Sequence, residues 1–307
     1  MSLKNNFVNM MTKKLIKGKS DETMIEVFRT AREDVKFDEN NFRISNFKVP
    51  VEYKYTQYFC NDIRLEEMKH FSYNPSNENA NVVLFFHGGG YIGRLNTIYT
   101  KFMYNFCKLV HNYKIISVEY RTLREHTFPC AYEDALFIWN YLIENGYKAE
   151  NIVIMGDSAG GGLGLALTMY LRDNNVKPKA YMGLSPWVNL TATSECFTNP
   201  KKRQMDPLFG SNNVIEILGK MYAGEHDIND WRISPLNGNF DNLPKMFITY
   251  GGLEILRDDI IELHKRASKN NDVVLKIYKK CQHDVITSDT KEAKIAMKDV
   301  ADFIKNL

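Results

Sequence analysis

The chain has 307 residues, 44% of them hydrophobic and 25% charged, a composition typical of a folded globular protein and unlike that of a disordered chain. Its 40 basic residues nearly balance 37 acidic ones without a long basic block, which argues against a nucleic-acid partner. No apolar stretch approaches the roughly 20 residues that span a bilayer, and the N-terminus lacks the apolar core of a secretory signal, so we expect neither a membrane span nor export.

The cysteines argue against a metal site and a disulfide framework. They are odd in number and scattered, without CxxC spacing or a nearby histidine pair that would indicate zinc. We interpret them as reduced thiols of a cytoplasmic protein: Cys60, Cys107, Cys130, Cys196 and Cys281.

The first predicted element is an amphipathic helix from about Met24 to Val35. Its apolar residues recur at helical spacing, and Asp21 stands where an N-cap residue is expected. Residues 51–71 are rich in β-branched and aromatic side chains and are interrupted by Cys60-Asn61-Asp62, which predicts two strands joined by a turn.

From Asn81 onward, short and nearly continuous apolar runs alternate with helical stretches. Runs that are apolar on both faces indicate parallel strands covered by helices on each side, so we predict an α/β fold with a mostly parallel central sheet. The strand runs are Val82–Phe86, Ile115–Val118, Ile152–Met155, Ala180–Leu184, Met246–Tyr250 and Val273–Tyr278. The helical stretches are Tyr99–His111, Ala131–Asn145, Gly161–Asp173, Ile260–Asn270 and Lys291–Leu307.

One interval, from about Val188 to Phe240, breaks this alternation. It is rich in Asn, Pro, Lys and Asp but contains a helical stretch, Asn213 to Tyr222. An insertion of this length between strands is more often a lid than a structureless loop, so we expect a lid here.

The pentapeptide Gly156-Asp157-Ser158-Ala159-Gly160 lies between a predicted strand and a predicted helix. That is the setting in which a GxSxG motif forms a sharp turn that exposes the serine hydroxyl at the carboxyl end of the sheet. The amide of Ala159, near the helix N-terminus, can donate to a developing oxyanion. The pentapeptide also arises by chance, so on its own it leaves catalysis open, and we interpret Asp157 as a packing or capping residue.

A second glycine-rich loop, His87-Gly88-Gly89-Gly90, follows the strand that ends at Phe86. Glycines there allow backbone N–H groups to point at a charge that no side chain crowds. A flexible loop or a phosphate cradle is the alternative, but neither GxxxxGK[ST] nor GxGxxG is present.

Together the two motifs resemble the hormone-sensitive-lipase-like family of α/β-hydrolases, a group of carboxylesterases. The resemblance continues in several segments and covers most of the chain from about Asn81 to its end: Glu119-Tyr120-Arg121, Glu125 to Pro129, Glu133-Asp134-Ala135, Ser185 to Val188, Ser234-Pro235-Leu236 and Gly251 to Asp259. By position it implies that Gly89, Gly90 and Ala159 form an oxyanion hole. It also implies that His87 braces the loop, and that Tyr120 and Arg121 are structural.

An activated serine needs a base and a third group that orients the base, in the chain order serine, acid, histidine in this fold. Only His264 and His283 lie beyond the strand ending at Tyr250. His264 falls within a helical stretch, whereas His283 follows the last strand, where the family keeps its catalytic histidine.

The acid is the least clear member, because the family usually has Asp-Pro-Leu-x-Asp where this chain has Glu254-Ile255-Leu256-Arg257-Asp258. Alignment of Leu256 and Asp258 with that motif places Glu254 at the acid position. A glutamate presents the same carboxylate, and we expect Asp258 and Asp259 to cap the following helix instead.

The resemblance therefore implies a serine esterase acting on short-chain carboxylic esters through Ser158, Glu254 and His283, with no metal or organic cofactor. A small ester is the expected partner, and a homodimer is left open. The alternatives are a noncatalytic receptor that binds a small ligand in the same place, and an amidase or peptidase with the same three residues. The expected organisation is N-terminal cap helices at 1–50, core at 51–187, a cap insertion at 188–240 and core at 241–307.

Overall fold

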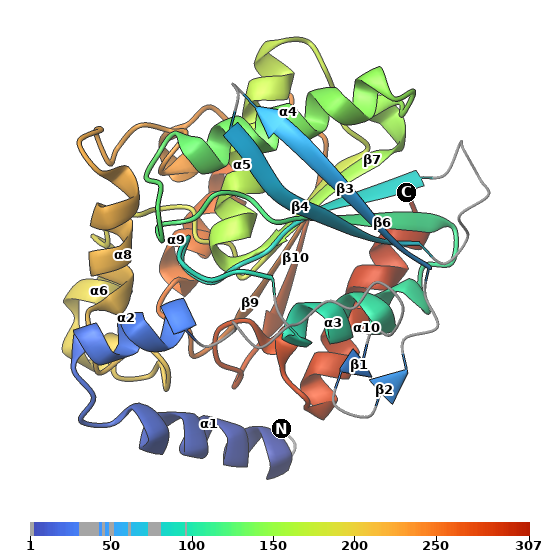
Figure 1. Ribbon diagram of the computed structural model, residues 1–307. Coiled ribbons are helices and arrows are strands. Elements are labelled where there is room, and N and C mark those ends of the chain that lie inside the picture. Colours follow the sequence, from blue (N-terminus) through green and yellow to red (C-terminus); the bar gives the residue numbers. More distant parts are fainter. Residues whose placement is uncertain are drawn as a thin grey trace.

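A computed structural model of the chain describes residues 3–30, 43–44, 47–48, 52–60, 63–72, 81–95 and 97–307 (Figure 1). Its centre is a sheet of 8 strands in the order β10-β9-β8-β7-β5-β6-β4-β3. The strands from β10 to β6 are parallel, and β4 and β3 add to the β6 edge in antiparallel orientation. The strands are β3 (Glu52–Cys60), β4 (Ile63–Ser72), β5 (Asn81–Phe86), β6 (Tyr113–Val118), β7 (Ile152–Asp157), β8 (Ala180–Leu184), β9 (Lys245–Gly251) and β10 (Val273–Tyr278).

Helices cover both faces of this sheet, as the apolar runs predicted. On one face, α4 (Cys130–Glu144), α5 (Ser158–Asp173) and α9 (Arg257–Ala267) pack on alternate strand residues such as Leu84 and Ile154. On the other, α3 (Thr97–Cys107) and α10 (Lys291–Lys305) pack on the intervening residues, such as Phe85 and Met155. The predicted α/β fold is confirmed, because the period-2 alternation of side chains sends each strand's apolar residues into two separate cores.

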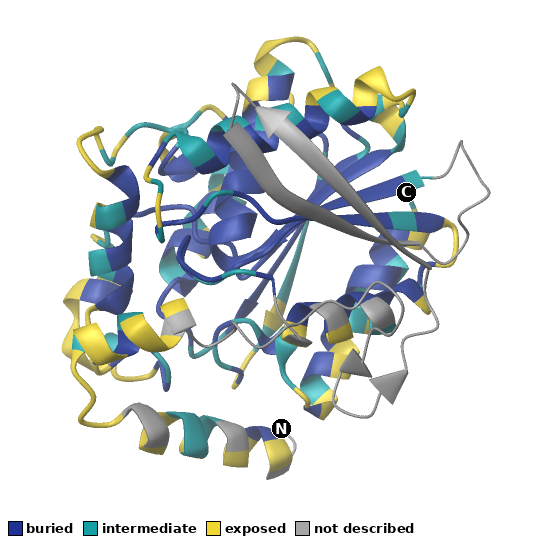
Figure 2. Ribbon diagram, in the orientation of Figure 1, coloured by how far each residue is buried: buried dark blue, intermediate teal, exposed yellow. Residues whose placement is uncertain are grey.

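The parallel strands are among the most buried parts of the molecule (Figure 2). Strands β5, β7 and β8 have almost no exposed residue, whereas β10 at the sheet edge is only partly covered. The carboxyl ends of β5, β7, β8, β9 and β10 therefore meet along one rim of a rigid scaffold, where open α/β sheets bind ligands. No helix in the described part of the chain is both long and apolar enough to cross a bilayer.

Two helices precede the sheet: α1 (Leu3–Ile16) and α2 (Asp21–Thr30). A two-stranded antiparallel pair follows them, β1 (Arg43–Ile44) with β2 (Phe47–Lys48). Helix α1 contacts α10, and its Asn5 and Asn9 side chains both donate to the carbonyl of Lys280 at 3.0 Å. Helix α2 contacts α8 of the insertion.

The predicted N-cap of α2 is wrong by one residue. The hydroxyl of Ser20, not the carboxylate of Asp21, accepts from the amide of Thr23, at 3.2 Å. Asp21 is the first helical residue, and its carboxylate instead accepts from the backbone and side-chain nitrogens of Asn213 at 2.8 and 3.1 Å. The last residues of the predicted helix, 31–35, lie outside the described residues.

The insertion between β8 and β9 contains the short helices α6 (Glu195–Thr198) and α7 (Pro200–Arg203) and the longer helix α8 (Val214–Ala223). The sequence predicted α8 but not α6 and α7, which are each a single turn. Three 3₁₀ turns complete the secondary structure: η1 (Ala149–Asn151), η2 (Pro235–Asn237) and η3 (Val285–Thr287).

Candidate active site

Ser158 stands at the junction of β7 and α5 in a left-handed backbone conformation, with φ at 48°. That conformation is strained for a residue with a side chain, and it is the mark of the sharp turn that the sequence predicted. The turn needs its glycines: a Cβ on Gly156 would lie 2.3 Å from the carbonyl oxygen of Gly160, and one on Gly160 would lie 2.1 Å from that of Phe86.

The loop after β5 presents its backbone to the same place. Gly89 and Gly90 have φ of 105° and 64°, which only glycine adopts readily. The carbonyl of Gly89 accepts from the amide of Gly93 at 2.8 Å, which folds the loop back on itself. In the described part of the chain the amides of Gly89 and Gly90 make no hydrogen bond, and both residues line a pocket with Ser158. Together with Ala159 at the start of α5, they are available to an oxyanion.

His87 is fully buried and faces its own loop, as expected for a bracing residue. Its Nδ1 lies 2.7 Å from the carbonyl oxygen of Gly88, and its ring stacks on Tyr120 with centroids 4.3 Å apart. The hydroxyl of Tyr120 donates to the carbonyl of His87 at 2.6 Å. Arg121 pairs with Asp134 at 2.7 Å, away from Ser158.

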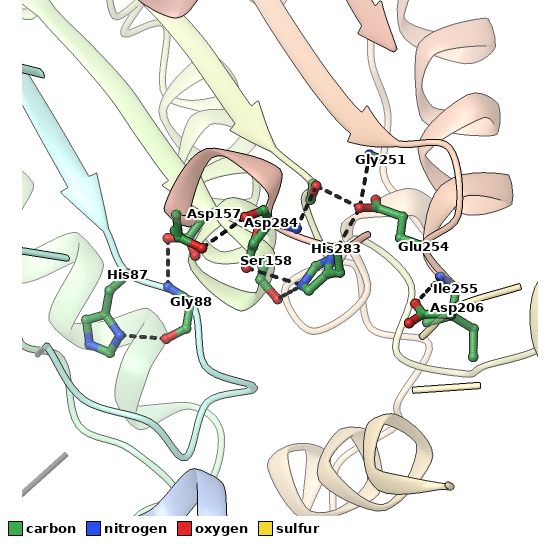
Figure 3. A network of polar contacts seen from close by, with 12 residues as sticks. His87, Gly88, Asp157, Ser158, Asp206, Gly251, Glu254, Ile255, His283 and Asp284 are labelled. Carbon is green, nitrogen blue, oxygen red and sulfur yellow. Dashed lines mark hydrogen bonds and ion pairs between the residues drawn. The ribbon is translucent and has the colours of Figure 1, made fainter. Parts of the chain in front are cut away.

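The structure brings Ser158, His283 and Glu254 into one line (Figure 3). Nε2 of His283 lies 2.9 Å from Oγ of Ser158, and its Nδ1 lies 3.4 Å from Oε2 of Glu254. The exposed fractions of Ser158, His283 and Glu254 are 5%, 6% and 0%. The Nδ1 contact is longer than a good hydrogen bond, a spacing often seen in catalytic groups before substrate binds.

Asp258, the other candidate acid, lies away from His283 and 3.4 Å from Nζ of Lys202. The expectation that Asp258 and Asp259 cap α9 is wrong in its detail. Both stand in the first turn of α9, but the N-cap residue of that helix is Leu256, which makes no side-chain cap. Asp259 accepts from Asn189 at 3.1 Å and from Ser194 at 3.3 Å, so the two carboxylates fasten α9 to the insertion.

Burial and neighbouring carboxylates act in opposite directions on His283. Burial alone lowers the pKa of its imidazole, but the carboxyl groups of Asp284, Glu254 and Asp206 outweigh burial and raise the pKa to about 10. Burial also raises the pKa of Glu254, while the nearby imidazole of His283 opposes that rise. A carboxylate beside Nδ1 stabilises the imidazolium that forms when His283 accepts a proton.

Three polar residues complete the site and were given no role from the sequence. The hydroxyl of Ser185, at the end of β8, donates to Oε2 of Glu254 at 2.8 Å, and the amide of Gly251 donates to the same oxygen at 3.2 Å. Asp206 of the insertion accepts from the amide of Ile255 at 2.7 Å and so holds the loop of Glu254. Asp284 lies beside His283. A polar residue at the end of a parallel strand is the one signal that could have identified Ser185.

Asp157 has the packing role that the sequence suggested. Its carboxylate accepts from the amide of Gly88 at 2.9 Å and from the hydroxyl of Tyr99 at 2.7 Å. It caps no helix by its side chain. Asp157 therefore links the two glycine-bearing loops.

A pocket of about 250 Å³ opens on Ser158. The core supplies Gly89, Gly90 and His283 to its wall, and the insertion supplies an apolar side: Leu208, Phe209, Ile215 and Leu218. Phe209 meets the ring of His283 edge-on, with centroids 5.7 Å apart. Among the described residues no group of three or more His, Cys, Asp or Glu side chains could hold a metal ion.

The parallel sheet, the helices on both faces and the strained serine turn after β7 define an α/β-hydrolase. The chain belongs to the alpha/beta hydrolase fold family, whose model matches residues 83–287.

Named relatives add the enzyme class. The chain is 29% identical over 231 residues to an esterase of Acinetobacter venetianus, covering 74% of this chain and 75% of that protein. It is 29% identical over 197 residues to an acetyl-hydrolase of Streptomyces hygroscopicus, covering 64% of each. A solved esterase of the bacterial hormone-sensitive lipase family has the same fold, with a TM-score of 0.81 at 24% identity over 100% of this chain and 98% of that one. The expected kinship with hormone-sensitive-lipase-like hydrolases is confirmed, and the relatives place the chain among carboxylic ester hydrolases.

Proposed function

We propose that this chain is a serine esterase that hydrolyses short-chain carboxylic esters through an acyl-enzyme on Ser158. His283 takes the hydroxyl proton as Oγ attacks the ester carbonyl, and it returns that proton to the leaving alcohol. Water then attacks the acyl-enzyme, with His283 again as the base, and releases the carboxylic acid. Glu254 stabilises the imidazolium in both steps, and Ser185 and Gly251 hold Glu254.

The observation that carries this proposal is the 2.9 Å contact between Nε2 of His283 and Oγ of Ser158, beside two glycine amides that make no hydrogen bond within the described residues. A base on the nucleophile and donors for the oxyanion are the two elements that acyl transfer requires. Gly89, Gly90 and Ala159 are the proposed donors. Since removal of one such donor typically costs about 10²–10³ in kcat, the loop geometry contributes strongly to the rate.

The preference for short acyl chains rests on the size of the pocket. Its volume of about 250 Å³ is below the roughly 300–1,000 Å³ typical of sites for drug-sized ligands. Residues 188–240 supply its apolar wall, and α1 and α2 lie against α10 and α8. We therefore assign residues 1–50 and 188–240 to a cap, and 51–187 and 241–307 to the core.

Location and assembly stay predictions. Cys107, Cys130, Cys196 and Cys281 are free thiols, which is consistent with the proposed cytoplasmic location, and the side chain of Cys60 lies outside the described residues. The proposal names no cofactor and leaves a homodimer open.

Covalent labelling tests the nucleophile. A fluorophosphonate should form one adduct on Ser158, detected by peptide mass spectrometry, and Ser158→Ala should abolish it. A noncatalytic receptor would bind the probe without an adduct, and a label elsewhere would contradict the proposal.

A chain-length series tests the substrate class. With p-nitrophenyl esters we expect kcat/KM to be highest for acetate to butyrate and to fall roughly ten-fold or more by octanoate, because added methylenes have no room in the pocket. Equal turnover of octanoate would contradict the short-chain preference. Faster turnover of matched anilides than of esters would favour the amidase alternative.

A further inference from the structure

Two neighbouring carboxyl groups lie beside the contact between Ser158 and His283 and have no part in the mechanism above. Asp157 precedes the nucleophile and is buried, while Asp284 follows the base, lines the pocket and is 17% exposed. Oδ2 of Asp284 lies 3.3 Å from Nε2 of His283, the same nitrogen that faces Ser158. The two carboxyl groups are hydrogen bonded to each other (Figure 3).

Two carboxyl groups can form a direct hydrogen bond only if one of them carries a proton. Asp157 accepts from the amide of Gly88 and the hydroxyl of Tyr99, and both bonds favour its ionised form. Oδ1 of Asp284 is buried and makes no hydrogen bond within the described part of the chain. An unpaired buried oxygen is far less costly on a neutral acid than on a carboxylate, so the proton resides on Asp284.

The charge on Asp284 decides the state of His283. An ionised Asp284 stabilises the imidazolium, and an imidazolium has no lone pair to accept the proton of Ser158. Burial raises the pKa of Asp284 well above its usual range; the charge of His283 opposes that rise, and those of Asp157 and Glu254 add to it. The pKa of about 10 for His283 includes the charge of Asp284 as a raising cause, together with Glu254 and Asp206. With Asp284 neutral, that contribution disappears.

We propose that Asp157 holds a proton on Asp284, and that this shared proton keeps Nε2 of His283 free to act as the base on Ser158. The inference rests on the proposed esterase function. Asp157 and Asp284 are positioning residues: their proton stays within the pair throughout the reaction, and they act on the substrate only through His283. The charged groups around His283 are then Asp157 from β7, Glu254 from the loop after β9 and Asp206 from the insertion.

The pH dependence of kcat/KM on p-nitrophenyl acetate tests this pair in three variants. Asp284→Asn keeps a donor to Asp157 without a charge, and asparagine tolerates the left-handed backbone at φ 52°. We expect the acidic limb of its pH profile, where kcat/KM rises as His283 loses its proton, to lie within about 0.3 pH unit of the wild-type limb. In Asp157→Asn the new amide donates to Asp284 and stabilises its ionised form. The limb should therefore move up by about one pH unit or more, because His283 stays protonated to higher pH.

The double variant Asp157→Asn/Asp284→Asn should return the limb to the wild-type position, since no carboxylate then lies beside Nε2. Asp258→Asn, on the same rim but away from His283, is the matched control. A limb that moves down by about one unit in Asp284→Asn shows that Asp284 is ionised in the wild type and overturns the proposal, even if Asp157→Asn does not fold.

An NMR titration of the His283 ring separates this proposal from the proposed function. It reports the same shifts without substrate, so it decides the charge state of the pair even if no ester is hydrolysed. Absence of ester turnover in the wild type at every pH would count against the esterase proposal alone.

Discussion

The two halves of the site are built by different means. The nucleophile half, formed by the loops after β5 and β7, is fixed by backbone: its glycines leave no space for a Cβ, and its serine is strained. The base half, formed by the loops after β9 and β10, is fixed by hydrogen bonds to side chains: the hydroxyl of Ser185 donates to Glu254, and the carboxylate of Asp206 accepts from the amide of Ile255. The first half should therefore be sensitive to added bulk, and the second to lost polarity.

Removing the base gives the largest expected effect. His283→Ala should lower kcat by roughly 10⁶-fold, since loss of one member of a catalytic triad can cost as much as the loss of all three. The fold should persist, as judged by circular dichroism. His264→Ala, in α9, is the matched control, and a similar loss in that variant would show that the base half has been assigned to the wrong histidine.

The acid gives the next largest effect. Glu254→Gln keeps the shape of the side chain but removes the charge that supports the imidazolium, so kcat should fall by roughly 10⁴-fold. Asp258→Asn should retain turnover, because its partner is Lys202 and not His283. Steady-state rates of the two variants decide between them: loss in the second without loss in the first would reverse the assignment.

Bulk in the nucleophile half should act on stability. Gly160→Ala would push a Cβ to 2.1 Å from the carbonyl oxygen of Phe86, and backbone cannot move aside as a side chain can. We expect the free energy of unfolding to fall by about 3 kcal/mol or more. Gly146, unlike Gly160, is at positive φ (87°), but a Cβ there would meet nothing within 4 Å, so Gly146→Ala should cost only the backbone strain of about 1–2 kcal/mol. Urea denaturation compares the two, and equal losses would mean that crowding does not shape the turn.

The smallest effect tests the hydrogen bonds of the base half. Ser185→Ala removes the donor to Glu254 without adding bulk, so kcat should fall about ten-fold, equivalent to about 1.4 kcal/mol, while the unfolding midpoint changes little. Ser194→Ala, whose hydroxyl contacts Asp259 instead, is the control. An unchanged kcat in Ser185→Ala would show that the backbone alone orients Glu254.

The difference between the nucleophile half, fixed by backbone, and the base half, fixed by side-chain hydrogen bonds, also explains what the sequence could predict. Strands, glycine loops and the serine turn are local patterns, so their positions could be identified from neighbouring residues. The hydrogen bond from Ser185 to Glu254 joins residues 69 apart in the chain, and that between Asp21 and Asn213 joins residues 192 apart. No local pattern encodes such pairings, which is why Asp21 was mistaken for a helix cap. Ser185, Asp206 and Asp284 were given no role for the same reason.

The N-terminal helix contacts the base half through polar side chains, among them Lys4, whose Nζ lies 2.8 Å from Oδ2 of Asp289. Asn5 and Asn9 of α1 both donate to Lys280, which precedes His283 by only a few residues. Trimming α1, or fusing a bulky tag that displaces it, would release the segment that carries the base. Protein with α1 trimmed or displaced should show a larger fall in kcat than rise in KM. The placement of a purification tag is therefore itself a variable in any assay of this enzyme.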